Sequence, residues 1–293
     1  MKIVRFDGGR IGLVIDGTVR DVTDAAGVEP REWPPVGPVR LIAEFDSRRG
    51  ALEAAAVTAP PIPLDNVELE PMIPWPNKLL AYPVNYRDHA AEMATAGLAS
   101  VQGFFLKANS SLCGAGATIE IPDLPGREVH HECEIGLIIG KGGRQIAAEN
   151  AYEHVFGYCC LLDITVRGKE ERVMRKSYET FTPIGPWITT ADEVPDPANI
   201  DMKLWVNDEL RQSANTRDLI VDIPNMIAIA SAATTLYPGD IICTGTPAGV
   251  GRIVAGDVVT IEVDGIGRMS LPVADSRYGR NAVFAKPYQF VRA

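Results

Sequence analysis

The sequence lacks any uninterrupted apolar run of about 18 residues, the minimum length of a transmembrane helix. Its first segment, MKIVRFDGGRIGLVIDG, lacks the apolar core and small-residue cleavage site of a secretory signal peptide. Basic residues are also in deficit, because 28 Lys and Arg stand against 38 Asp and Glu, a formal net charge of −10. These absences argue against a membrane protein and against a nucleic-acid partner. We therefore expect a cytoplasmic protein.

Cysteine is rare, with five residues in all, and the number is odd. Cys159 and Cys160 are adjacent and lack the C-x-x-C spacing of a thiolate zinc site. An odd number of cysteines in apolar surroundings does not indicate a disulfide framework. We expect small, reduced core residues at all five positions, which are Cys113, Cys133, Cys159, Cys160 and Cys243.

The chain is long and apolar enough, at 293 residues and 46% hydrophobic, to bury one large core or a large and a small one. Short strand-like segments at 2–6, 11–15 and 18–22, then a helical segment at 39–57, predict a small N-terminal α+β domain over residues 1–66. The proline-rich segment 59–66 would connect it to a second domain, residues 67–293.

The second part of the chain is rich in strand-like segments. Helices are expected only at 87–96, 147–153 and 224–236. The predicted strands are 78–86, 103–108, 132–140, 155–166, 186–190, 201–208, 240–245, 257–263 and 268–273. Since strands dominate and do not alternate with helices, the pattern favours an α+β fold built on a mixed β-roll or sandwich over a doubly wound sheet.

Two carboxylates, Glu132 and Glu134, interrupt the apolar segment HHECEIGLIIG at 130–140. Because side chains alternate along a strand, both point the same way. Two like charges in a low-dielectric site drive one carboxyl to protonate, unless a cation lies between them. The pair therefore indicates either a divalent metal site or an edge strand with one solvated face.

Asp163 is the only acidic residue in the apolar run FGYCCLLDITV. Alternation places Arg167 on its face, so a buried Asp163–Arg167 ion pair is one interpretation. The other makes Asp163 the third ligand of a hard cation with Glu132 and Glu134. A set of carboxylates suits Mg²⁺ or Mn²⁺ better than zinc or copper.

Two further motifs are of a catalytic type. His89 and Glu92, three apart in NYRDHAAEM, would share one helix face, where the carboxylate can orient the imidazole to take a proton from water. The same spacing also occurs on solvated helix faces. The loop in LYPGDIICTGTPAGVG offers backbone N–H groups and the hydroxyls of Thr244 and Thr246 to an anion, or uses its glycines only to turn.

Seven segments in consistent order resemble the fumarylacetoacetate hydrolase superfamily, in its two-domain bacterial type. They are NYRDHAAE, FFLKANSSL, HECEIGLIIGKGGR, GYCCLLDITVRG, KSYETFTPIGPW, VNDELRQ and PGDIICTGTPAGVG. Together they run from about Leu79 to Val273, and the E-x-E and the later Asp have the family's spacing.

The resemblance implies a mixed β-roll, a homodimer, bound Mg²⁺ or Mn²⁺, and a small 2-oxo acid or 1,3-dicarbonyl substrate, often from the breakdown of aromatic compounds. The positions that match the family's site are Glu132, Glu134 and Asp163 for the metal, His89, Glu92 and Lys176 for catalysis, and Thr246, Lys107 and Arg167 for substrate binding.

The implied reaction is hydrolysis of a carbon–carbon bond. His89, oriented by Glu92, would deprotonate a water that attacks the more distant carbonyl, and Lys176 would hydrogen-bond to the oxygen that gains charge. Many family members carry Asn and Asp where this chain has Leu162 and Gly168, beside the metal. A decarboxylase, isomerase or hydratase of a related 2-oxo dicarboxylic acid is therefore a second interpretation, and a non-catalytic, metal-stabilised dimeric module is a third.

Overall fold

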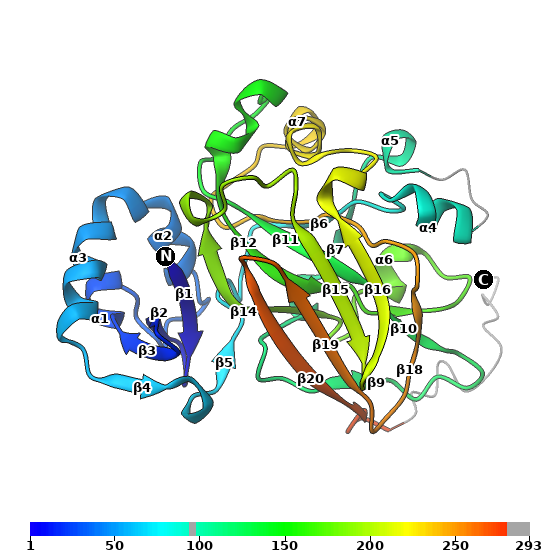
Figure 1. Cartoon of the computed structure of the whole chain (residues 1–293), viewed down its shortest axis with the longest axis horizontal. Helices are drawn as coiled ribbons and strands as arrows, with labels where there is room; N and C mark the ends of the chain where they lie inside the picture. Colours follow the sequence, from blue (N-terminus) through cyan, green and yellow to red (C-terminus); the bar gives the residue numbers. More distant parts are fainter. Residues whose placement is uncertain (94–97, 280–293) are drawn as a thin grey trace, which may run out of the picture.

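The computed structural model describes residues 1–93 and 98–279. The predicted α+β, strand-rich fold is confirmed (Figure 1). The main sheet runs in the order β4 (Pro61–Pro63), β3 (Thr18–Asp21), β2 (Arg10–Ile15), β1 (Lys2–Phe6), β14 (Thr182–Thr190), β12 (Val155–Leu162), β11 (Cys133–Ile139), β17 (Ile241–Cys243), β6 (Leu79–Ala81) and β7 (Phe105–Lys107). Two short strands extend it, β5 (Leu69–Glu70) beside β1 and β8 (Leu112–Cys113) beside β14.

Two smaller sheets accompany the main one. The first has the order β16 (Glu209–Asn215), β15 (Asp201–Val206), β19 (Val258–Val263), β20 (Gly267–Asp275) and β9 (Ile119–Ile121). The second has the order β13 (Thr165–Val166), β10 (Val129–His131) and β18 (Gly251–Ile253). Buried residues of the first smaller sheet share one core with residues of the main sheet, so the two form a sandwich.

Strand β11 lies inside the main sheet and is buried on both faces. Ile135 and Leu137 belong to the core shared with Leu204 of β15. Ile138 points the other way, into a second core that contains Leu52 of the N-terminal part. The interpretation of this segment as an edge strand with one solvated face is therefore wrong, because neighbours pair with both of its edges and cores cover both faces. An acidic residue on β11 is forced into the interior.

The N-terminal part adds strands β1 to β4 to the main sheet, since β1 pairs antiparallel with β14 through Lys2 and Thr189. It also contains helices α1 (Thr23–Ala26), α2 (Gly37–Ala43) and α3 (Phe45–Thr58). The predicted single helix at 39–57 is wrong in one respect. The chain leaves helical geometry at Glu44, where φ is −105° and ψ is 8°, so two helices form. The division into two domains at residue 66 stays a prediction.

The remaining helices lie outside the N-terminal part (Figure 1) and are α4 (Arg87–Glu92), α5 (Ala99–Gln102), α6 (Arg172–Arg175) and α7 (Ile223–Ala233). The end of the helix predicted at 87–96 falls partly outside the described residues. The helix predicted at 147–153 is instead a 3₁₀ helix, Ala148–His154. Within residues 1–93 and 98–279, none of the helices has the length and apolarity needed to cross a bilayer. All five cysteines are buried and free, as predicted.

Asn85 holds together three segments that border the candidate site. Its amide nitrogen donates to the carbonyl oxygens of Thr244, at 2.8 Å, and Val221, at 3.0 Å. Its amide oxygen accepts from the Val221 N–H at 2.8 Å. The side chain is completely buried, so these backbone groups have no access to water as a substitute partner.

Replacing Asn85 with Ala should lower the free energy of unfolding by about 3–5 kcal/mol, because each buried backbone group left without a partner costs about 1–3 kcal/mol. Urea unfolding followed by circular dichroism measures the change. Asn225→Ala is the matched control, since the Asn225 side chain is exposed and donates a hydrogen bond to Asp222. Equal stability of the two variants would contradict the structural role of Asn85.

Candidate active site

Three buried carboxylates meet where β11 and β12 lie side by side. Glu132 and Glu134 flank the first residue of β11, and Asp163 follows the last residue of β12. The antiparallel register sets Cys133 opposite Leu162, and the Asp163 N–H donates to the Glu132 carbonyl oxygen at 3.0 Å. Carboxylate oxygens of the three acids consequently lie within 4.8 Å of one another. The structure thus brings together the predicted ligand set.

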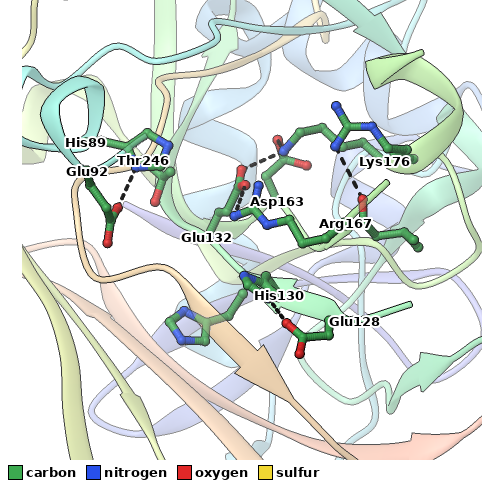
Figure 2. Close-up of polar contacts among 12 residues, drawn as sticks. His89, Glu92, Glu128, His130, Glu132, Asp163, Arg167, Lys176 and Thr246 are labelled. Carbon is green, nitrogen blue, oxygen red and sulfur yellow. Dashed lines mark hydrogen bonds and ion pairs between the residues drawn. The ribbon is translucent and has the colours of Figure 1, made fainter. Parts of the chain in front are cut away.

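Two lysines balance part of this negative charge, and Figure 2 shows one of them, Lys176. Lys176 Nζ lies 2.5 Å from Glu132 Oε2 and 2.7 Å from Asp163 Oδ2, and Lys107 Nζ lies 2.5 Å from Asp163 Oδ1. Burial alone would raise the pKa of Asp163, but the two ammonium groups outweigh it and lower that pKa. The same contacts raise the pKa of Lys176 against its own burial.

The alternative in which Asp163 pairs with Arg167 is wrong. Asp163 takes the two lysines as partners, and Arg167 lies with its guanidinium 3.5 Å from Glu132 Oε1. The intervening residues form β13, which pairs with β10. This pairing directs the chain away from Asp163 before Arg167 is reached.

Glu134 has a different environment from its two neighbours. It accepts a hydrogen bond from the Gly245 N–H at 2.7 Å, and in the described part of the chain it forms no ion pair. Burial first, then the charge of Asp163, raises its pKa well above the ordinary value. Glu134 is thus a buried acid whose ionised form needs a further positive charge.

This donor set fits a divalent cation. All three ligands are hard oxygen donors from buried side chains, which is the chemistry that Mg²⁺ and Mn²⁺ prefer. Two ammonium groups do not neutralise three carboxylates, and neither of them bonds to Glu134. A cation among the three oxygens would restore the preference of Glu134 for the ionised form.

The His89–Glu92 pair forms as predicted, with Nδ1 of the imidazole 2.9 Å from Glu92 Oε2 (Figure 2). Because an ionised carboxylate only accepts, Nδ1 carries the proton and Nε2 remains as the basic nitrogen. The second oxygen of Glu92 accepts from the Gly249 N–H at 3.0 Å. The carboxylate therefore joins α4 to the loop after β17. His89 itself is buried, which does not fit a solvated helix face.

The loop after β17 is mainly structural. The Thr244 hydroxyl accepts from the Ile135 N–H at 3.0 Å, and the Gly245 N–H is used by Glu134. The expectation that Thr244 and free N–H groups here bind an anion is therefore wrong for these two residues. Thr246 does line the cavity, and its hydroxyl accepts from Gln212 Nε2 at 2.8 Å.

Gln212 of β16 was not singled out by the sequence beyond its presence in the segment VNDELRQ. Its side chain is buried and its amide nitrogen also donates to the Pro247 carbonyl oxygen at 2.9 Å. Its amide oxygen accepts from the Cys133 N–H and from His131 Nδ1, both at 3.0 Å. Gln212 thus fixes the Thr246 loop to the start of β11. No local sequence pattern identifies such a bridge.

Most of these groups line one cavity of about 380 Å³. Glu92, Lys107 and Gln212 do not line it but bond to residues that do. Glu132, Glu134 and Asp163 line this cavity together with His89 and Thr246. Its apolar wall consists of Tyr82, Pro83, Val84, Met93 and Phe105. Its basic wall consists of Arg167, Arg172, Arg175 and Lys176. Lys107 lies behind Asp163, where it also donates to the Phe181 carbonyl oxygen at 3.1 Å.

The sequence interpretation omitted Arg172 and Arg175. The available signal was the density of basic residues in RGKEERVMRK at 167–176, of which only the first and last were singled out. Helix α6 turns this short segment so that four of its basic side chains reach the cavity.

The family model for the C-terminal part of fumarylacetoacetate (FAA) hydrolase matches residues 78–274. The chain belongs to the fumarylacetoacetate hydrolase family. The matched residues contain every group of the candidate site described above. Membership also agrees with the mixed, strand-rich fold.

Two relatives match nearly the whole chain. Maleylpyruvate hydrolase from Aquipseudomonas alcaligenes is 41% identical over 285 residues, which cover 93% of this chain and 99% of that protein. A crystal structure of maleylpyruvate hydrolase from Sphingobium sp. SYK-6, in complex with manganese(II) and pyruvate, has 53% identity and a TM-score of 0.87. It covers 94% of this chain and 100% of that chain.

A more distant solved structure belongs to a probable 2-hydroxyhepta-2,4-diene-1,7-dioate isomerase from Mycobacterium abscessus. Its identity to this chain is 30%, its TM-score is 0.78, and the match covers 94% of this chain and 99% of the other. The fumarylacetoacetate hydrolase family thus includes relatives of this chain that are named for two different reactions.

Mn²⁺ or Mg²⁺ added to chelator-treated protein should raise the thermal unfolding midpoint by roughly 5 °C at a hundredfold excess over Kd, because the ion binds only the folded chain. Glu134→Gln should remove most of this shift. The ion-free variant should be at least as stable as the wild type, because it no longer contains a buried acid without a cationic partner. Differential scanning fluorimetry measures both effects.

Glu262→Gln is the control for this experiment, since Glu262 contacts Arg268 at the surface, on another sheet. It should retain the full metal-dependent shift. A Glu134→Gln protein that responds to metal as strongly as the wild type would contradict the assignment of Glu134 as a ligand.

Proposed function

We propose that this protein is a metal-dependent hydrolase that cleaves the carbon–carbon bond of an acylpyruvate such as maleylpyruvate, in the breakdown of aromatic compounds. The observation that carries the proposal is that three buried carboxylates line the same cavity as His89, whose imidazole is hydrogen-bonded to Glu92. Two relatives with near-complete coverage and at least 41% identity are maleylpyruvate hydrolases, which supports the choice of substrate class.

The reaction adds water to the acyl carbonyl carbon of the substrate. The water oxygen forms a new bond to that carbon, and the bond between it and the adjacent methylene carbon breaks. The electron pair of the broken bond stays with the pyruvate fragment, which then takes a proton at carbon. The products are a carboxylate, pyruvate and one proton released to solvent.

The roles of the chain's own residues follow from their contacts. His89 accepts the proton of the attacking water at Nε2, and the carboxylate of Glu92 stabilises the imidazolium that forms. Gly249 holds Glu92 in place through its N–H. Lys176 places an ammonium group between Glu132, Asp163 and the cavity, where it can donate to a substrate oxygen that gains negative charge.

Glu132, Glu134 and Asp163 would hold Mg²⁺ or Mn²⁺, and the bound ion supplies positive charge that polarises carbonyl oxygens. Arg167 and Thr246 line the same cavity and are assigned to substrate binding. Lys107 is assigned the role of supporting Asp163, because its ammonium group lies against that carboxylate. We also propose that the protein is cytoplasmic, as its sequence composition favours, and a homodimer, as the family resemblance implies.

A second candidate, isomerisation or decarboxylation of a related 2-oxo dicarboxylic acid, is favoured by the relative that is a probable dioate isomerase. Its identity of 30% is lower than the 53% of the hydrolase structure. Hydrolysis is therefore the preferred activity.

Replacing His89 with Ala should lower turnover by about 100- to 10,000-fold, the usual contribution of a general base, and should leave metal binding intact. Loss of the enol absorbance of acetylpyruvate or maleylpyruvate measures turnover, and the metal-dependent thermal shift measures ion binding. His130→Ala is the matched control, because this ring contacts Glu128 outside the cavity (Figure 2). Near-full activity of the His89 variant would refute the role of the pair.

Chelation with EDTA should abolish hydrolysis, and added Mn²⁺ or Mg²⁺ should restore it. Pyruvate and the matching carboxylate should appear in equal amounts, as measured by chromatography. Release of carbon dioxide, or an isomer without pyruvate, would favour the second candidate instead. A protein that turns over none of these substrates, with or without added metal, would indicate a non-catalytic module.

A further inference from the structure

Arg172 differs from the other basic residues of the cavity in its surroundings. It lies on α6, lines the cavity and is half-buried. Its guanidinium lies over the Phe105 ring, 5.2 Å from the centroid, and donates one hydrogen bond to Gln102 Oε1 at 2.9 Å. In residues 1–93 and 98–279 it forms no ion pair. Its charge therefore faces the cavity without an anionic partner.

The other three cationic groups of the cavity wall are already engaged. Arg175 donates to the carbonyl oxygens of Glu170, at 2.8 Å, and Val166, at 3.3 Å. These hydrogen bonds stabilise the segment before α6. Arg167 is directed toward Glu132, and Lys176 bonds to two of the acids. Arg167 Nη2 has no hydrogen-bond partner in the described part of the chain, but it lies 3.5 Å from the carboxylate of Glu132. Among these four cations of the described chain, Arg172 is the one with neither an ion pair nor a hydrogen bond to a backbone carbonyl.

The position of Arg172 is unfavourable unless an anion is bound. Burial first, and then the like charge of Arg175, lower its pKa below the ordinary value, and the charges of Glu132, Asp163 and Glu171 offset this only in part. A carboxylate that accepts from two N–H groups of the guanidinium would offset both effects, and it is the partner that the planar geometry of arginine matches. The contacts with Phe105 and Gln102 hold the guanidinium in one orientation before a ligand arrives.

Arg172 and the cluster of acids line the same cavity. Arg172 and Phe105 come from α6 and β7, which pack against each other, whereas the acids come from the ends of β11 and β12. The proposed mechanism uses the acids, His89 and Lys176 for the pyruvate end of an acylpyruvate, which leaves Arg172 for its other end. The cavity has a volume of about 380 Å³, near the lower end of the roughly 300–1,000 Å³ of small-molecule sites, so one substrate can contact both groups.

We propose that Arg172 binds a second carboxylate, at the acyl end of the substrate, and so makes the enzyme selective for dicarboxylate over monocarboxylate acylpyruvates. This inference rests on the proposed hydrolase function and adds the residue that determines substrate choice. Phe105 and Gln102 are positioning residues for the guanidinium.

The test compares kcat/KM for maleylpyruvate, whose acyl chain ends in a second carboxylate, with kcat/KM for acetylpyruvate, which has a methyl group in place of the whole carboxyvinyl group. Arg172→Gln should lower kcat/KM for maleylpyruvate by about 10- to 100-fold, mainly through KM, because a hydrogen-bonded charged partner is lost. The value for acetylpyruvate should stay within about threefold of wild type. The kcat/KM of Arg172→Lys for maleylpyruvate should lie between those of the wild type and Arg172→Gln, since lysine keeps the charge and loses the bidentate contact.

Arg268→Gln is the matched control. Arg268 also lies over an aromatic ring, that of Trp205 at 5.3 Å, but on the five-stranded sheet away from the cavity. Arg268→Gln should leave kcat/KM for both substrates unchanged.

Product inhibition gives a second test. Maleate, the acyl product, should inhibit the wild type more strongly than it inhibits Arg172→Gln, whereas acetate should inhibit both proteins equally.

The outcomes separate this inference from the function on which it rests. Equal losses for both substrates in Arg172→Gln, or no loss for either, would refute the role of Arg172 while the hydrolase assignment stands. If the metal-loaded wild type hydrolyses neither substrate, the proposed function is wrong and the inference falls with it. A loss confined to maleylpyruvate supports both.

Discussion

The site depends on the burial of three carboxylates at one point. An isolated ionised carboxyl in the interior of a protein costs several kcal/mol, so three of them within 4.8 Å require compensating charge. The chain supplies part of it through Lys107 and Lys176, both of which bond to Asp163. Among the described residues, Glu134 has the backbone N–H of Gly245 as its hydrogen-bond partner and no ion pair. The two lysines thus neutralise Glu132 and Asp163 in part, and the charge of Glu134 remains for a divalent ion to balance.

The main sheet makes this arrangement rigid. Strand β11 is paired on both edges and packed on both faces, so Glu134 cannot turn toward solvent. Antiparallel pairing with β12 brings Asp163 beside Glu132 although they are 31 residues apart in sequence. Gln212 and Thr244 then attach the loop after β17 to the start of the same strand. Backbone pairing within the sheet therefore fixes the positions of the acids, and side-chain hydrogen bonds fix the loop that faces them.

The cavity is divided by chemistry. Its acidic part, with His89 and Lys176 beside it, suits a reaction in which a carbonyl gains charge. Its basic part is carried largely by the short segment around α6, which holds Arg172 and Arg175 and is followed directly by Lys176. The three acids and His89 are held at the ends of strands and on α4, whereas Arg172 and Lys176 lie on the connection between β13 and β14. Connections tolerate more sequence change than the elements they join, so this segment is a place where related chains can differ in substrate.

The sequence by itself identified the site residues whose positions follow from local strand or helix geometry. The apolar run after Glu134 identified β11, the alternation of side chains along a strand gave Glu132 and Glu134 a shared direction, and helical spacing identified His89 with Glu92, because these patterns are local. Tertiary structure decided what depends on distant partners. The choice of lysines over Arg167 as the partners of Asp163, the bridge made by Gln212 and the exposure of Arg172 to the cavity all come from packing between segments far apart in sequence. No local pattern encodes such contacts, since their energy arises only when the sheet has assembled.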